Sequence, residues 1–113
     1  MPIVIPAPEP KDPNIYEAGN LDKLPEYPGG INAFYKMIGD NYRMPQQQVN
    51  GKIFVSFVIE ANGMLSEKKI IRDIGHGTGT ELLRVLALSA IWAPGEINRK
   101  PVRVLYKLPL NIQ

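Results

Sequence analysis

The sequence contains no cysteine and a single histidine, His76. Without cysteine the chain has no disulfide framework, no thiol nucleophile and no thiolate metal site, and one imidazole cannot form a site of several histidines. Long apolar runs are missing as well, since no stretch approaches the ~20 residues that span a bilayer. Met1–Pro6 has neither the basic start nor the long apolar core of a signal peptide. We therefore expect either a cytosolic chain or the soluble piece of something longer.

What the sequence does contain suits one globular domain with a proline-rich beginning. Its 113 residues are 44% hydrophobic and 21% charged, which is ordinary for a folded domain. Seven of the 11 prolines lie within residues 1–28. Their spacing favours an extended segment over 1–14, which is either a semi-rigid spacer or a tail without a role. Ile15, Tyr16 and Leu21 are compatible with a short strand.

Two periodic segments come next. Apolar residues recur every three to four positions from Ile31 to Tyr42, which predicts an amphipathic helix over 31–42. Between Gly51 and Glu60 they alternate instead, which predicts a strand with one buried face, formed by Ile53, Val55, Phe57 and Ile59. Asn62-Gly63 then favours a tight turn into a returning strand over about 65–74.

A second helix and a last strand complete the order. Thr78 and Glu81 have the spacing of a capping box, and a helix is predicted over about 80–91. Trp92–Gly95 ends this helix, and Trp92 is expected to be mostly buried at the corner. Alternation predicts the last strand from Val102 to about Leu108.

This order of elements predicts the fold class. Helix, hairpin, helix and strand indicate an α+β domain, in which a small antiparallel sheet of about three strands carries two helices on one face. We assign residues 1–27 to a proline-rich, extended linker and residues 28–113 to the folded domain.

No group of residues in the sequence supports catalysis. The loop Gly75–Gly79 lacks the glycine spacing of a dinucleotide fingerprint and the Lys-Ser/Thr ending of a phosphate loop. No serine or threonine is spaced to pair with His76 as nucleophile and base. The carboxylates do not lie among apolar residues that would raise their pKa values. We therefore predict that the protein is not an enzyme and that it binds neither a metal nor another cofactor.

The basic excess beyond residue 28 raises nucleic-acid binding as another class. Seven basic residues would cluster if the returning strand and the last strand were neighbours: Lys68, Lys69, Arg72, Arg99, Lys100, Arg103 and Lys107. The aromatic residues that stacking requires occupy core positions instead, and no nucleic-acid motif is present. A solvated basic face is the better interpretation, and no nucleic-acid partner is expected.

Three blocks of sequence, in this order, resemble one protein family. They are Pro25–Gly30, which reads Pro-Glu-Tyr-Pro-Gly-Gly, then Gly51–Gly63, and then Leu83–Val104 with its Trp-Ala-Pro-Gly and Pro-Val-Arg-Val motifs. Together they are similar to the C-terminal domain of TonB, the periplasmic energy transducer, in its Bacteroidetes-like subgroup. The resemblance covers residues 25–112.

The resemblance implies a role in the cell envelope. Members of the TonB family carry an N-terminal inner-membrane helix, a proline-rich span across the periplasm and this domain at the far end. They work with an ExbB/ExbD-like, proton-driven motor and bind the TonB box of outer-membrane transporters for siderophores, vitamin B12 or glycans. The implied location is the periplasm, with an anchor in the inner membrane in the full-length protein. Because the membrane helix is absent here, we expect an excised domain or a shortened member.

The family also implies a binding site. Its TonB box pairs edge-on with the last strand of the domain, which here implies a partner-binding edge formed by Arg103, Val104, Leu105, Tyr106 and Lys107. A final strand that no later strand covers agrees with this mode of binding. Two functions stay open, namely energy transduction through strand addition and an adaptor or docking module of another envelope protein. A monomer and a strand-exchanged homodimer both stay open.

Overall fold

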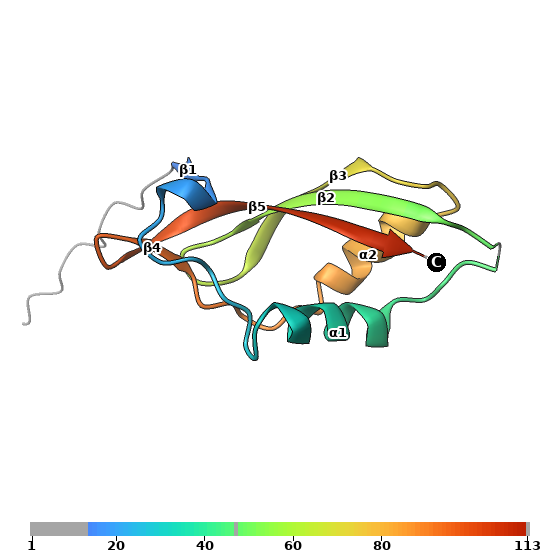
Figure 1. The fold of residues 1–113 in the computed structure, drawn as a ribbon, viewed down its shortest axis with the longest axis horizontal. Helices are drawn as coiled ribbons and strands as arrows, with labels where there is room; N and C mark the ends of the chain where they lie inside the picture. The colour runs from blue at the N-terminus through green and yellow to red at the C-terminus, as the bar shows by residue number, and fades with distance from the viewer. Residues whose placement is uncertain (1–13, 47, 113) are drawn as a thin grey trace, which may run out of the picture.

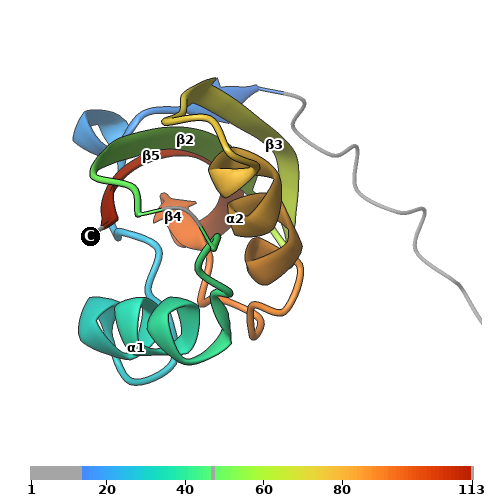
Figure 2. The same cartoon turned by 90° about the vertical axis from the view of Figure 1, so that its right-hand side faces the viewer.

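The computed structural model describes residues 14–46 and 48–112 and shows an α+β domain with two helices. In chain order the elements are β1 (Ile15–Tyr16), a 3₁₀ turn (Ala18–Asn20), α1 (Ile31–Asn41), β2 (Gly51–Ile59), β3 (Leu65–Arg72), α2 (Thr78–Leu86), β4 (Gly95–Ile97) and β5 (Lys100–Ile112). The sheet is curled, and both helices lie on its concave side (Figures 1 and 2). The predicted spacer lies outside the described residues apart from Asn14.

The predicted sheet of about three antiparallel strands is wrong in count and in direction. In the part of the chain that the structure describes, the sheet has five strands in the order β1-β5-β2-β3, with β4 paired to β5 beside this path. β1 runs parallel to β5 and makes the sheet mixed, whereas the other pairings are antiparallel. β4 joins β5 through Asn98 and Arg99, whose φ angles of 52° and 66° fit the tight turn that connects twisted strands.

The first helix forms almost as predicted, but the second differs in its start and its end. The capping box is wrong, because Gly77 is the N-cap and Thr78 is already helical. Thr78 Oγ1 instead donates to the carbonyl oxygen of Gly75 at 2.7 Å. α2 ends at Leu86 rather than near residue 91, since the chain must turn there to bring the Trp92 N–H to the carbonyl oxygen of Gly63, 2.9 Å away.

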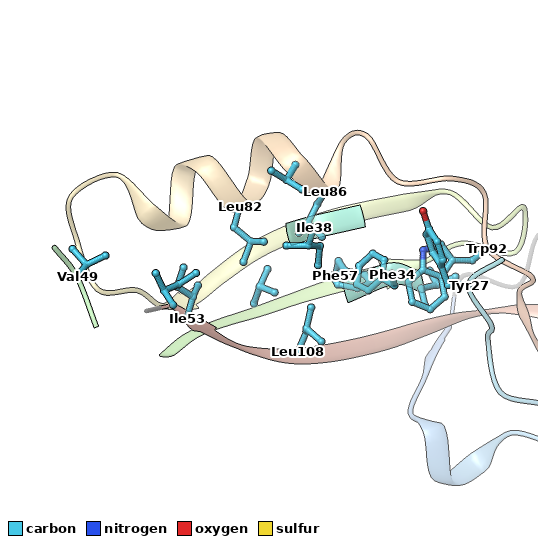
Figure 3. Packing of buried hydrophobic residues seen from close by; sticks show 14 residues of the cluster. Tyr27, Phe34, Ile38, Val49, Ile53, Phe57, Leu82, Leu86, Trp92 and Leu108 are labelled. Atoms are coloured by element: carbon cyan, nitrogen blue, oxygen red, sulfur yellow. The ribbon is translucent and has the colours of Figure 1, made fainter. Parts of the chain in front are cut away.

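An aromatic cluster fills one end of the core, and Trp92 lies in it as predicted, 2% exposed. Its ring centroid lies 4.9 Å from that of Phe34 and 5.4 Å from that of Tyr27. Aliphatic residues of both helices and of β2 and β5 continue the core toward the other end (Figure 3). Gly63 has no room for a side chain, because a Cβ there would collide with the carbonyl oxygen of Trp92.

Candidate functional site

One long edge of β5 is not paired by any strand of the described chain. β2 lies along one side of β5, with an uninterrupted antiparallel register from Val104 to Ile112. On the opposite side β1 pairs only with Arg103 and Val104. Between Leu105 and Ile112, therefore, no strand of residues 14–46 or 48–112 covers this side of β5. We call the β1 side of Leu105–Ile112 the free edge.

Pro109 shows which backbone groups point to the free edge. Opposite residues in an antiparallel pair alternate between those that exchange two hydrogen bonds and those that exchange none. Pro109 lies opposite Phe54 and has no N–H to donate, so this pair is of the non-bonded kind. Because the backbone groups of a strand alternate in direction, those of Lys107 and Asn111, two residues to either side of Pro109, point the same way as those of Pro109. They present both N–H and C=O to the free edge, whereas Pro109 presents only its C=O.

The other edge of the sheet, β3, is a poorer template for an added strand. Its register against β2 shifts twice, between Phe54 and Val55 and between Ser56 and Val58. Glu67 of β3 has a φ angle of 45°. Irregularities of this kind, together with charged side chains, are devices that protect edges from pairing. β5 is the edge with the regular register.

The five residues predicted to bind a partner do not share one environment. Arg103 and Val104 are paired with β1, Leu105 lies where β1 ends, and Lys107 lies on the free edge. Tyr106 points to the helix side, where its ring stacks on Phe57 at 5.4 Å and 18°. Burial raises the pKa of Tyr106, with a smaller contribution from Tyr35.

Sequence reasoning missed the far part of the edge and the strand that limits it. β5 continues to Ile112, four residues beyond the end near Leu108 that alternation predicts. Of the short strand predicted through Ile15, Tyr16 and Leu21, only Ile15 and Tyr16 form β1, and these two residues gave no sign that they pair with β5.

Arg103 is engaged in an ion-pair network on the outer face of the sheet. Its Nε donates to Glu60 at 2.9 Å, and its Nη2 donates to Glu60 at 3.2 Å and to Glu67 at 2.8 Å. The hydrogen bond to Glu60 is the main cause that raises the pKa of Arg103, and Ser66 donates to the same carboxylate. The Arg103 guanidinium is therefore already neutralised within the domain.

The basic residues do not form the single cluster that neighbouring strands would give. β2 separates β3 from β5, so Lys69 and Lys107 lie on either side of Ser56 in one row across the sheet. Neighbouring strands are about 4.8 Å apart, which places these two backbones roughly 10 Å from each other. Lys107 is exposed, and it is the one basic residue on the free edge.

Within residues 14–46 and 48–112, no group of three or more His, Asp or Glu side chains is placed to hold a metal ion. His76 is exposed in its loop with a φ angle of 56°. Among the helices of these residues none has the length and apolarity needed to cross a membrane.

The free edge of β5 is thus the candidate binding site of the described residues. Comparison of the chain with protein-family models, with curated proteins and with solved structures finds no match.

Proposed function

We propose that this chain is the C-terminal domain of a TonB-type energy transducer. In this proposal it acts in the periplasm and binds the TonB box of outer-membrane transporters by strand addition along the free edge of β5. It thereby couples the proton-motive force of the inner membrane, through an ExbB/ExbD-like motor, to active uptake. The observation that supports it best is the regular, uncovered edge at Leu105–Ile112.

The geometry of the edge supports strand addition physically. Lys107 and Asn111 offer donors and acceptors, and an extended peptide satisfies such groups with main-chain hydrogen bonds. Each of these bonds contributes only about 0.5–1.5 kcal/mol net. An isolated peptide is therefore expected to bind weakly, and the transporter must add further contacts.

The direct test is an NMR titration of a TonB-box peptide into the isotope-labelled chain. We expect the largest backbone amide shifts at Lys107 and Asn111 and in the residues between them. Large shifts in Gly75–Gly79 or in α1, with Leu105–Ile112 unchanged, would contradict strand addition at this edge.

Substitution at Lys107 provides a matched pair of variants. Lys107→Pro removes one edge-facing N–H without touching the hydrogen bonds to β2, as Pro109 already does in the native sequence. Lys107→Gln removes the charge and keeps the N–H. If the edge is the site, the proline variant loses binding much more than the glutamine variant, while circular dichroism shows both folded. Equal binding by the two variants would contradict a main-chain contact at position 107.

Energy transduction and passive docking share this edge, so they need a separate test. Co-purification of the full-length protein with inner-membrane motor proteins is expected for a transducer. Its absence, with peptide binding intact, would favour the adaptor function.

A further inference from the structure

We propose that a pocket beside Tyr106 receives an apolar side chain of the strand that pairs with the free edge, and that this residue selects the partner. The inference rests on the proposed strand addition and adds to it a requirement on the partner's sequence. The occupant is one large apolar side chain on the helix-facing side of an extended peptide.

The pocket lies between β5 and the segment that leads into α1. It has a volume of about 290 Å³, and its lining combines the apolar and aromatic side chains of Leu24, Tyr27, Ile31, Trp92 and Tyr106 with Pro25, Glu26 and Gly30. Two short antiparallel bridges, Lys23–Glu96 and Glu26–Ala93, hold this segment beside β4, and from there it runs to the start of α1 (Figure 1). The volume is at the lower limit of the about 300–1,000 Å³ typical of small-molecule sites, and it suits a side chain.

Tyr106 connects the pocket to the free edge, because it belongs to both. Side chains of adjacent strands alternate between the two faces in step, so a peptide paired with β5 places every second side chain on the face of Tyr106. The backbone groups of Tyr106 point to β2, since those of Lys107 point away. In an antiparallel complex Tyr106 would then lie in a non-hydrogen-bonded pair, in which opposite side chains approach most closely.

Exposed apolar side chains around the pocket indicate what covers it. Leu24 is 60% exposed, Ile31 40% and Tyr35 39%. Ile31 and Tyr35 are one helical turn apart on α1, and Tyr35 is close enough to affect the pKa of Tyr106. An apolar side chain in the pocket would be enclosed by α1 on one side and by Tyr106 on the other.

Two synthetic peptides and one native reporter test the proposal. The probes are an eight-residue peptide of alternating valine and threonine with leucine at its fifth position, and the same peptide with alanine there. Trp92 is the one tryptophan of the chain and lines the pocket, so its indole N–H signal reports occupancy. We expect the leucine peptide to bind about tenfold more tightly, from partial burial of its three additional carbon atoms, and to shift the Trp92 signal.

Matched variants of the protein locate the effect. Ile31→Ala truncates a side chain that lines the pocket. Ile91→Ala truncates an isoleucine that does not line the pocket and is 63% exposed. We expect the leucine-to-alanine ratio to fall to about threefold in the first variant and to remain about tenfold in the second.

The outcomes separate this inference from the proposed function. If both peptides shift the backbone amide signals of Lys107 and Asn111 equally and the indole N–H signal of Trp92 does not move, strand addition is supported and the pocket inference is overturned. The pocket inference is also overturned if the ratio of the affinities of the leucine and alanine peptides is the same for Ile31→Ala as for the native chain. If neither peptide shifts the edge residues, strand addition fails, and the pocket inference fails with it.

Discussion

Replacing Trp92 by alanine tests the packing on which both binding features depend. The Trp92 ring is 2% exposed and lies 5.5 Å from the ring of Tyr106. Its Nε1 donates to Ser89 Oγ at 3.1 Å, so its polar atom is satisfied. Truncation of a buried aromatic residue costs about 3–5 kcal/mol, and each aromatic pair adds about 0.5–1.5 kcal/mol beyond the buried area. With four aromatic neighbours within 6.2 Å, we expect a loss near the upper value.

Urea unfolding followed by far-UV circular dichroism measures this loss without relying on tryptophan fluorescence. For an m-value of about 1.5–2 kcal/mol/M, a loss of about 5 kcal/mol lowers the midpoint of Trp92→Ala by roughly 2.5–3.3 M. Ile91→Ala is the control, because this neighbouring side chain is exposed and its truncation should change the stability by less than about 0.5 kcal/mol. An unchanged midpoint in Trp92→Ala would refute the packing described here.

Substitutions at five other positions give three further tests. Gly63 and Gly75 have φ angles of 84° and 86°, so alanine costs roughly 1–2 kcal/mol at either; Gly63→Ala should be the less stable variant in urea, because only its Cβ meets a backbone carbonyl, and equal midpoints would contradict this. The hydrogen bond from a neighbouring arginine lowers the pKa of Glu81 from 4.5 to about 2. The ionised form is thus favoured by folding, and its contribution is present above pH 4.5 and lost as the pH falls toward 2. In Glu81→Gln the urea midpoint should therefore depend less on pH between pH 4.5 and 2 than in the native chain. The same pH dependence in both proteins would count against the ion pair. Arg103→Gln should lower the stability and leave the affinity for an acidic peptide nearly unchanged. Lys107→Gln should lower that affinity and leave the stability nearly unchanged. A peptide titration at low salt, together with urea unfolding curves of both variants, distinguishes the two outcomes.

The elements with long, regular periods were predictable from the sequence. α1 and β2 each present one unbroken apolar face, and both form within about one residue of the expected bounds. The burial of Trp92 was predictable too, because a large aromatic side chain at a turn between a helix and a strand is usually packed in the core. These features depend on local pattern and on composition.

The missed features depend on pairings between distant segments. β1 has two residues and finds its partner, Arg103 and Val104, at the opposite end of the chain. β4 has three residues, too few to show a period, and its turn uses Asn98 and Arg99 where a pattern search expects glycine. The end of α2 is set by the hydrogen bond of Trp92 to the β2–β3 loop. No local signal encodes such contacts.

The sequence predicts the strand that forms the candidate edge, but which backbone groups face the free edge follows only from the pairing register of β5 with β2. The alternation of apolar residues predicted the last strand only from Val102 to about Leu108. Once Pro109 is placed opposite Phe54, this residue shows that the odd-numbered positions around it face away from β2. The free edge therefore follows from one proline and one register, which neither the sequence nor the strand order supplies alone.

The two prolines of β5 also bear on whether this edge would pair with a second copy of itself. Pro101 and Pro109 both occupy odd-numbered positions, so neither removes a hydrogen bond to β2, and β4 keeps its bonds to the even-numbered Lys100 and Val102. Both prolines lack a donor on the side of β5 that faces away from β2, and of the two only Pro109 lies within the free edge. Two copies of β5 paired edge to edge would leave out a donor at each Pro109 and would bring two Lys107 charges onto one sheet, and both are devices that discourage self-association. A peptide that has no proline and no lysine opposite this edge meets only the missing donor of one Pro109 and the charge of one Lys107. The edge is therefore better suited to a different extended chain than to its own copy.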